Sequence, residues 1–339
     1  MPFGYRGGSP AGYAAKLAAA LGEAPGPEGI KLLLQSAYSF NTFIEALKSF
    51  AIAAWIEDTS SPRGIEIGMR RWLSTRIAQA RAFASGAREL INMAYSTYIA
   101  ARDLTLLLRM AYEGEEPPQP DALAAPENPL VKHVYKFYLE TRSFRGIHDY
   151  LQRTAFHMLP KLLDYYLKVE GANGIDAAID TLIAWLFNNA YRNTMQARYY
   201  LCPRLDMLYA RVMLNLAMRG APREVIEEFI RLLRPCKLPD LTREASIGDP
   251  EAIMLKLRST FYGEVTEPDM IKAFAIVENL IRREARKRAA MGIASNPLSV
   301  GFATAALEYL TLDLYDIVVI ANGAFAGARP SEIAQQLSV

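Results

Sequence analysis

Apolar residues recur with the period of an α-helix through most of this chain. One early stripe consists of Ile30, Leu33, Leu34, Ala37 and Tyr38. Spacings of three and four residues place such side chains on one face of a helix. Similar patterning runs from Met69 to Met110 and through the apolar stretch from Ala305 to Ala326. No segment of any length alternates with the period of two that is typical of a half-buried strand, so the pattern predicts an all-α protein.

Proline-rich segments interrupt the helical pattern. The clearest linker is residues 113–129, which contain five prolines, and a second is residues 235–250, which contain three. Proline lacks the backbone N–H that the interior of a helix uses. For the same reason we expect Pro203 to break the chain before a helix from Leu205 to Met218.

A similar helix ending occurs three times. Gly114, Gly220 and Gly327 are separated by 106 and 107 residues, and each is followed by proline within four residues. Asp103 and Asp316 each precede their glycine by eleven residues, whereas the copy before Gly220 is looser and begins at Leu208-Tyr209. Glycine just after a helix and proline shortly beyond it are stop signals. We therefore expect three similar helical-bundle units, at residues 1–120, 121–234 and 235–339.

The front of each expected unit also repeats. A leucine is followed by a small hydroxyl residue and then by an aromatic residue in Leu34–Tyr38, in Leu151–Phe156 and, more faintly, in Leu257–Tyr262. One such pattern would carry no information, because it is short and made of common residues. Three copies in phase with the three glycine endings support the division into units.

Composition limits the class of protein. Of the 339 residues 51% are hydrophobic and 22% are charged, and the formal net charge is +2. These values are ordinary for a globular protein and exclude wholesale disorder. The charge is too small to indicate a nucleic-acid partner. Residues 1–8 lack the apolar core of a signal peptide, and charges interrupt every apolar run before it could span a bilayer. We expect a soluble, intracellular protein without a membrane span.

The two cysteines are far apart and form no Cys-x-x-Cys pair. Cys202 and Cys236 are the only ones among 339 residues. Such sparse use suits a reducing cell interior better than a secreted fold stapled by disulfides.

Motifs that carry chemistry are missing. The sequence has no phosphate-binding Gly-x-x-x-x-Gly-Lys-Ser/Thr loop, no Gly-x-Gly-x-x-Gly after a strand and no His-Glu-x-x-His. The three histidines are His133, His148 and His157, and His148-Asp149 lacks the further histidine ligands of a metal phosphohydrolase. We expect no catalytic, cofactor-binding or metal-binding residues, and a surface or packing role for His148.

Two kinds of charged feature remain. Arginines and lysine gather at Arg70 and Arg71 and, more densely, at Arg282, Arg283, Arg286, Lys287 and Arg288. They form either a solvated helix face or a contact with an acidic partner protein or lipid headgroups. Stacking aromatic residues are not interleaved with them, which disfavours single-stranded nucleic acid. Asp103 and Asp316, midway along apolar helices, are expected to pair with arginines of the same bundle.

The C-terminal stretch resembles one family. Asn296-Pro297, Tyr309, Asp313 and Asp316, followed by the run from Gly327 to Ile333, are similar to the closing signature of the C subunit of archaeal and bacterial A/V-type ATP synthases, called subunit d in eukaryotic vacuolar ATPases. The chain departs from the family pattern at Leu310, where a basic residue is usual. It also lacks the usual aromatic-rich Tyr-x-x-x-Arg-x-Arg opening, of which residues 5–6 and 13–16 keep only faint echoes.

The resemblance implies a funnel of three similar helical units around a pseudo-threefold axis. Such a subunit lies on the cytoplasmic side of the membrane, between the rotor ring of c/K type and the central axle subunits of D and F type. It transmits torque and performs no catalysis. The seven basic residues named above are then candidates for contacts with these partners.

Two other classes of function stay open. An α-helical protein-binding scaffold usually repeats every 34 to 47 residues, whereas the period here is near 106. An all-helical enzyme with an unrecognised site would need clustered acids or histidines in a cleft. A basic RNA-associated protein, a weaker alternative, would need the positive charge of residues 282–288 to extend over a broad surface.

Overall fold

Long helices alternate with groups of short ones in the computed structural model, which describes residues 8–154, 156–220 and 233–339. The helices are α1 (Pro10–Glu23), α2 (Gly26–Gln35), α3 (Phe40–Leu47), α4 (Pro62–Arg81), α5 (Ala87–Glu113), α6 (Pro129–Thr141), α7 (Phe144–Leu151), α8 (Met158–Glu170), α9 (Gly174–Asn193), α10 (Arg198–Met218), α12 (Thr242–Ser246), α13 (Pro250–Leu257), α14 (Met270–Ile293), α15 (Val300–Phe325) and α16 (Pro330–Ala334). Strands in the described residues are limited to the hairpin of β1 (Ser259–Thr260) and β2 (Gly263–Glu264). The predicted all-α class is confirmed.

The three glycines that end the predicted repeats have left-handed backbone conformations. Their φ angles are +73° at Gly114, +60° at Gly220 and +73° at Gly327. Glycine adopts this conformation without the steric cost that a Cβ atom imposes, so it ends α5, α10 and α15 cleanly. The three repeated fronts lie at the C-terminal ends of α2, α7 and α13.

The helical pattern from Met69 to Met110 is divided between two helices. α4 ends at Arg81 and α5 begins at Ala87, with Gly86 at φ +56° as the residue before α5. The apolar period continues across the break because α4 and α5 pack against each other, so both need an apolar face.

The predicted break at Pro203 is wrong, because Pro203 lies inside α10. Proline cannot donate a hydrogen bond to the carbonyl four residues earlier, which is that of Tyr199. The guanidinium of Arg288, on α14, donates to this carbonyl instead, with Nη1 3.0 Å from the oxygen. A side chain from a distant helix therefore satisfies the acceptor that proline leaves free, and the helix continues.

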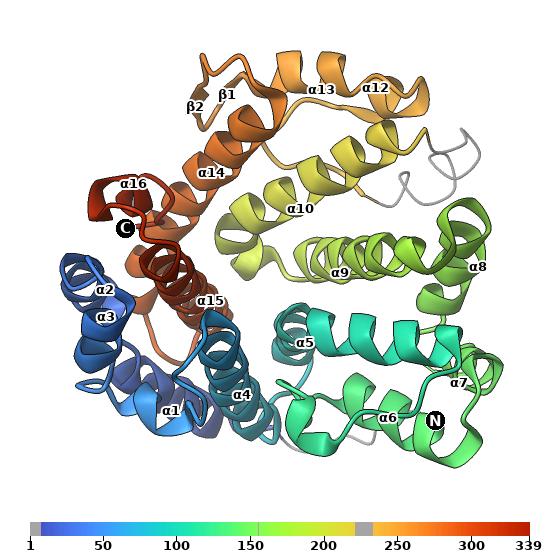
Figure 1. Cartoon of the computed structure of the whole chain (residues 1–339), viewed down its shortest axis with the longest axis horizontal. Coiled ribbons are helices and arrows are strands. Elements are labelled where there is room, and N and C mark those ends of the chain that lie inside the picture. Colours follow the sequence, from blue (N-terminus) through green and yellow to red (C-terminus); the bar gives the residue numbers. More distant parts are fainter. Residues whose placement is uncertain (1–7, 155, 221–232) are drawn as a thin grey trace.

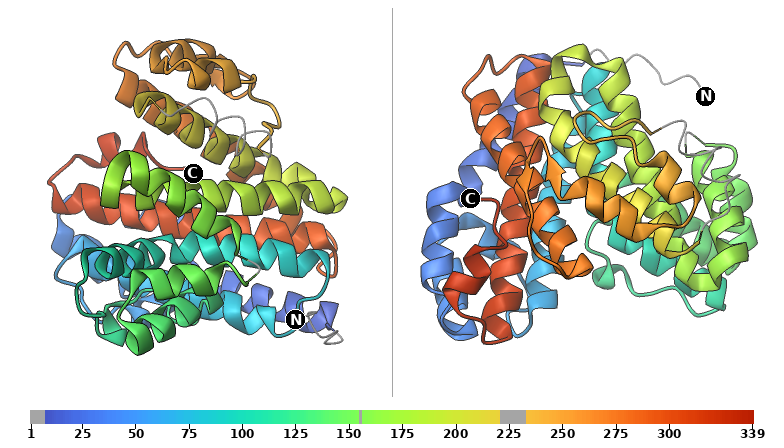
Figure 2. Two further views of the ribbon diagram at one scale, coloured as in Figure 1. Left: turned by 90° about the vertical axis from the view of Figure 1, so that its right-hand side faces the viewer. Right: turned by 90° about the horizontal axis from the view of Figure 1, so that it is seen from above.

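Six long helices pack in a closed sequence of contacts. α4 packs with α5, α9 with α10 and α14 with α15; in addition α5 packs on α9, α10 on α14 and α15 on α4. Figure 1 shows these helices around the middle of the molecule, with short helices on the outside. Figure 2 shows α12 and α13 beyond α10, at one edge. The contact of α15 with α4, and also with α1, α2 and α3, joins the end of the chain to its beginning.

Candidate functional site

A buried aspartate lies midway along each of α5, α10 and α15 and accepts hydrogen bonds from backbone N–H groups further along the chain. The acceptors and donors are Asp103 with Ala124 (3.0 Å) and Ala125 (2.5 Å), Asp206 with Cys236 (2.5 Å) and Lys237 (2.8 Å), and Asp316 with Ser338 (2.9 Å). All three aspartates are at most 2% exposed. Each carboxylate thus binds the backbone of a segment that follows its helix in the sequence. A buried N–H group without an acceptor would lower the stability of the fold.

The expected arginine partners are present for only one of the two aspartates named from the sequence. Asp316 pairs with Arg286 at 3.0 Å, whereas the hydrogen-bond partners of Asp103 are backbone N–H groups. Asp206 was missed because it precedes Gly220 by fourteen residues rather than eleven. The difference of three residues is close to one helical turn. A sequence search for an acid in an apolar helix, eleven to fifteen residues before the glycine, would have found Asp206.

Arg286 joins the two ends of the chain. Its guanidinium lies 2.5 Å from Asp313 and 3.0 Å from Asp316, both on α15, and also donates to Ser338 Oγ. Asp313 in turn accepts the backbone N–H of Gly26, at the start of α2, at 3.0 Å. The network therefore holds the N-terminal helices against the C-terminal ones.

Two carboxylates and one guanidinium give this buried network an excess negative charge. Burial raises the pKa of Asp316 from 3.8 to about 6, against the opposing effect of Arg286. Between pH 4 and pH 6 the folded chain therefore holds a proton that the unfolded chain releases, so stability falls as the pH rises through this window. The free energy of unfolding in urea is measured at pH 4 and at pH 6. We expect the decrease between the two pH values to be smaller by about 2–3 kcal/mol in Asp316→Asn than in the unaltered protein. Asp149→Asn, at an exposed position, is the control; equal slopes for both variants would contradict the assignment.

A second buried network joins α5, α10 and α15 near the middle of the molecule. Arg204 of α10 forms a two-pronged ion pair with Glu308 of α15, at 2.8 and 3.1 Å. Tyr95 of α5 donates to the same carboxylate at 2.6 Å. The three side chains, here called the central node, are at most 3% exposed. Ion pairs this deep stabilise only when their geometry is good. Here Nε and Nη2 of Arg204 both bind the carboxylate, and the Tyr95 hydroxyl donates to it as well.

The half-buried side chains of Tyr98, Tyr315 and Arg211 adjoin the central node, together with the buried Arg282 and Glu278. Arg204 stacks over the ring of Tyr98, and Arg282 stacks over the ring of Tyr315 at 3.9 Å. Glu278 accepts from both Arg282 (2.8 Å) and Arg211 (2.7 Å). Tyr98, Tyr315, Arg211, Arg282 and Glu278, here called the tyrosine–arginine cluster, come from α5, α10, α14 and α15.

Cations dominate the electrostatic surroundings of Tyr98 in the tyrosine–arginine cluster. Burial alone raises the pKa of a tyrosine, yet the pKa of Tyr98 is lowered overall by the nearby guanidiniums of Arg204, Arg211, Arg282 and Arg70. Partial exposure of Tyr98, Tyr315 and Arg211 leaves these groups within reach of a partner. Polar, aromatic and arginine side chains on a rigid support are typical of the energetic centres of protein interfaces.

The basic segment of α14, residues 282–288, contains both buried and exposed cations. Arg282, Arg286 and Arg288 are only 4–6% exposed and pair with acids of this chain, so they do not form a solvated face. Arg283 and Lys287 are exposed. The spacing of these residues along the helix explains the difference. Cations lie on two sides of α14, and only one of those sides is turned toward solvent.

Arg70 and Arg71 are half-buried and bind backbone carbonyls. Arg70 donates to Ile99 O at 2.9 Å and pairs with Glu66, while Arg71 donates to Asp121 O at 2.8 Å. They therefore connect α4 to α5 and to the linker before α6. A contact of any of the seven basic residues with a partner stays a prediction.

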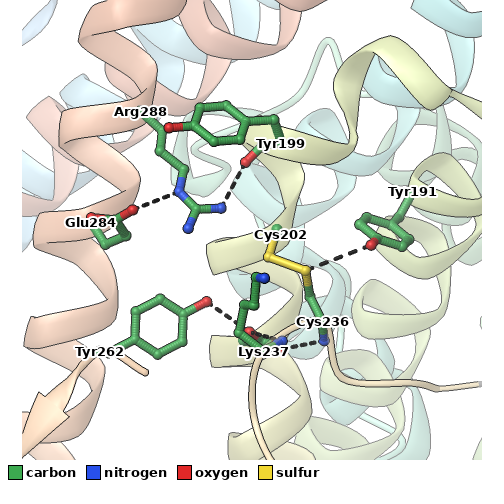
Figure 3. Close-up of a disulfide and its surroundings, with 9 residues drawn as sticks. Tyr191, Tyr199, Cys202, Cys236, Lys237, Tyr262, Glu284 and Arg288 are labelled. Atoms are coloured by element: carbon green, nitrogen blue, oxygen red, sulfur yellow. Dashed lines mark hydrogen bonds and ion pairs between the residues drawn. A yellow bond between two sulfur atoms is a disulfide. The ribbon is translucent and has the colours of Figure 1, made fainter. Parts of the chain in front are cut away.

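Cys202 and Cys236 form a disulfide, whereas the sparse use of cysteine in the sequence indicated a fold without one. Figure 3 shows the bond between α10 and the segment that follows residues 221–232. The sequence could not reveal it, because the two cysteines are 34 residues apart and only the fold brings their Cα atoms within 5.5 Å.

The same place offers the group of three potential metal ligands found among the described residues. Ligand-type atoms of Cys202, Asp206 and Cys236 lie within 4.8 Å of one another. Both sulfur atoms are joined to each other, however, and a disulfide sulfur is not a thiolate ligand. His148 has its Nε2 3.0 Å from Asp164, and its ring lies 6.5 Å from that of Phe144, centre to centre, consistent with the expected packing role.

Comparison with known proteins supports the resemblance found in the sequence. The family model for the ATP synthase (C/AC39) subunit matches residues 31–336, which is nearly the whole chain. No curated protein matches significantly. Among the described residues, the helices are all too short or too polar to cross a membrane. The chain belongs to the C/AC39 family of A/V-type ATP synthase subunits.

Proposed function

We propose that this chain is a central-stalk rotor subunit, a non-catalytic socket that couples the membrane rotor ring (c/K type) to the axle subunits (D and F type). Its place would be the cytoplasmic side of the membrane. The observation that carries the proposal is the closed cycle of contacts among the six long helices, from α4 and α5 through to the return of α15 onto α4. A closed ring of helices resists twisting, which a torque-transmitting part requires.

Three similar units around a pseudo-threefold axis would account for this cycle. Each of α5, α10 and α15 ends at a left-handed glycine and holds a later backbone segment through a buried aspartate. Each also packs on the long helix before it and on a long helix of another pair. In this proposal the units are residues 1–120, 121–234 and 235–339, arranged as a funnel.

The tyrosine–arginine cluster is the part of the funnel that we assign to the axle. It lies beside the central node, where α5, α10 and α15 converge, and its half-buried groups come from several helices at once. An axle helix seated there would bear on all of them together, so that torque passes into a stiff support rather than into one flexible side chain.

Arg211→Ala tests this assignment. The side chain of Arg211 is 28% exposed, and Glu278 keeps its pairing with Arg282 after the change, so the fold should persist. We expect affinity purification of the tagged variant from native membranes to recover at least about tenfold less axle subunit, with the ring subunit retained. Arg153→Ala, at an exposed position, should change neither. Recovery of the unaltered chain alone, without ring and axle, would refute the rotor proposal itself; normal axle recovery with Arg211→Ala would refute only the assigned contact.

A further inference from the structure

A row of alternating aromatic and cationic side chains lies beside the disulfide, exposed at Tyr199, Phe261 and Lys237 and buried at Arg288. The guanidinium of Arg288 is 4.7 Å from the ring centre of Tyr199 and 5.9 Å from that of Phe261. The ammonium of Lys237 is 5.4 Å from the ring centre of Phe261. These four residues, here called the aromatic–cation row, come from α10, α14, the β1–β2 turn and the segment before α12. Four segments distant in the sequence therefore build one surface.

Anchors beneath the row hold it rigidly in place. In the two-residue turn between β1 and β2, Tyr262 points inward and donates to Asp206 at 2.7 Å, which leaves Phe261 projecting outward. Asp206 also accepts the backbone N–H of Lys237, next to the disulfide at Cys236 (Figure 3). Burial and the adjacent Asp206 carboxylate raise the pKa of Tyr262, so its hydroxyl keeps the proton that it donates. One buried carboxylate thus positions two members of the row.

The other end of the row is fixed by the proline in α10. Arg288 donates to the Tyr199 carbonyl, which Pro203 leaves free, and to Glu284 at 2.7 Å. The guanidinium is therefore locked against the Tyr199 ring, as Figure 3 shows. Binding to a surface whose side chains are already ordered costs less conformational entropy.

The row exposes apolar area that nothing in the described residues covers. Tyr199 is 50% exposed and Phe261 is 60% exposed. Met291, three residues after Arg288 on α14 and hence on a neighbouring part of the same face, is 48% exposed. Tyrosine, phenylalanine, methionine and arginine are the residues enriched in the centres of protein interfaces, while isolated exposed side chains would be spread over several faces.

We infer that the aromatic–cation row docks an acidic segment of another subunit of the ATP synthase. Carboxylates of that segment would lie near Lys237, and its apolar side chains would pack on Phe261, Tyr199 and Met291. Charge complementarity identifies this partner, because the exposed charge in the row is the ammonium of Lys237, whereas Arg288 is buried and paired with Glu284. The inference rests on membership of the ATP synthase family and not on the assigned axle contact.

Nucleic acid fits the row less well. Bases bind by stacking on open aromatic faces. Arg288 already stacks on both rings, and Lys237 stacks on that of Phe261. The chain as a whole has 38 basic and 36 acidic residues, far from the strong positive charge of phosphate-binding proteins.

Photo-crosslinking in the intact complex tests the inference. Phe261 is replaced with p-benzoylphenylalanine, the complex is purified from native membranes and irradiated, and the product is mapped by mass spectrometry. We expect a covalent product with one other subunit, at a segment rich in Asp and Glu. The same replacement at Tyr38, which is 72% exposed on a different part of the surface, controls for exposure alone and should give no product at that segment.

A charge reversal makes the test specific. Lys237→Glu, combined with the crosslinker at Phe261, should lower the yield by about tenfold, whereas Lys132→Glu, at an exposed position of α6, should leave it unchanged. The inference is overturned if the intact complex gives no product, if the product maps to a segment without acids, or if nuclease treatment abolishes it. The composition of the purified complex is checked before irradiation. If this chain is absent from it, the assignment as a subunit fails, and not only the docking inference.

Discussion

Replacing Glu308 with leucine is expected to lower the free energy of unfolding by about 3–5 kcal/mol. The change leaves the guanidinium of Arg204 buried at 3% exposure without its carboxylate, and it removes the acceptor of the Tyr95 hydroxyl. An unpaired charge in the interior costs far more than the lost attraction itself, since water cannot replace the missing partner. The measurement is equilibrium unfolding in urea, with the m-value checked for constancy.

A compensated variant separates the cost of an unpaired charge from the cost of lost packing. In Tyr95→Phe/Arg204→Met/Glu308→Leu all three polar partners of the central node are removed together, so no buried group is left unsatisfied. We expect this triple variant to recover most of the stability lost in Glu308→Leu. If the triple variant is as unstable as Glu308→Leu, or if Glu308→Leu costs less than about 1 kcal/mol, the node does not hold the three helices together as described.

Replacing both disulfide cysteines, as Cys202→Ala/Cys236→Ala, is expected to lower the free energy of unfolding by about 3–4 kcal/mol. A bond across 34 residues removes much of the freedom of the unfolded chain. The attachment of Cys236 to Asp206 benefits most from such a bond, because it closes the longest loop of the three aspartate attachments. From Asp206 to Cys236 is 30 residues, whereas the corresponding distances from Asp103 to Ala124 and from Asp316 to Ser338 are 21 and 22. A longer loop costs more entropy to close.

Reduction of the unaltered protein is the matched comparison. Dithiothreitol should shift the urea midpoint of the unaltered chain toward that of the double variant and leave the double variant where it is. Non-reducing mass spectrometry should meanwhile show the unaltered chain two mass units below its reduced form. A free-thiol assay that finds two reactive cysteines in the unfolded, unreduced chain would rule out the bond, and equal midpoints with and without reductant would rule out its contribution to stability.

Local patterns were sufficient for the all-α class and for the ends of three long helices. The period of apolar residues predicted helices because one stripe of each helix must be buried, and this requirement acts within a few turns of chain. The glycines that end α5, α10 and α15 were recognised because a left-handed residue at a helix end depends on its own Cβ atom alone. The C-terminal signature was recognised in the same way, and the family model confirms it over residues 31–336.

Predictions failed where a distant residue changes what a local pattern means. Pro203 usually ends a helix, but Arg288, 85 residues later, satisfies the carbonyl that it leaves free. Arginines on α14 had the pattern of a charged surface, but three of them are interior residues. Arg282 pairs with Glu278, Arg286 with Asp313 and Asp316, and Arg288 with Glu284. Glu278 and Glu284 lie four residues before their arginines on α14 itself, but only the packing of α10 and α15 against α14 decides that these arginines are buried.

The sequence by itself determined that this protein is helical, where α5, α10 and α15 end, and that it belongs with ATP synthase C subunits. Those properties follow from backbone sterics, from the burial of apolar stripes and from a continuous signature, all of which act along the chain. Only the tertiary structure decided which charged side chains are interior, that Cys202 and Cys236 are bonded, and that Tyr199, Arg288, Phe261 and Lys237 share one surface. Each of these depends on the distance between residues from different elements, which is set when the helices pack.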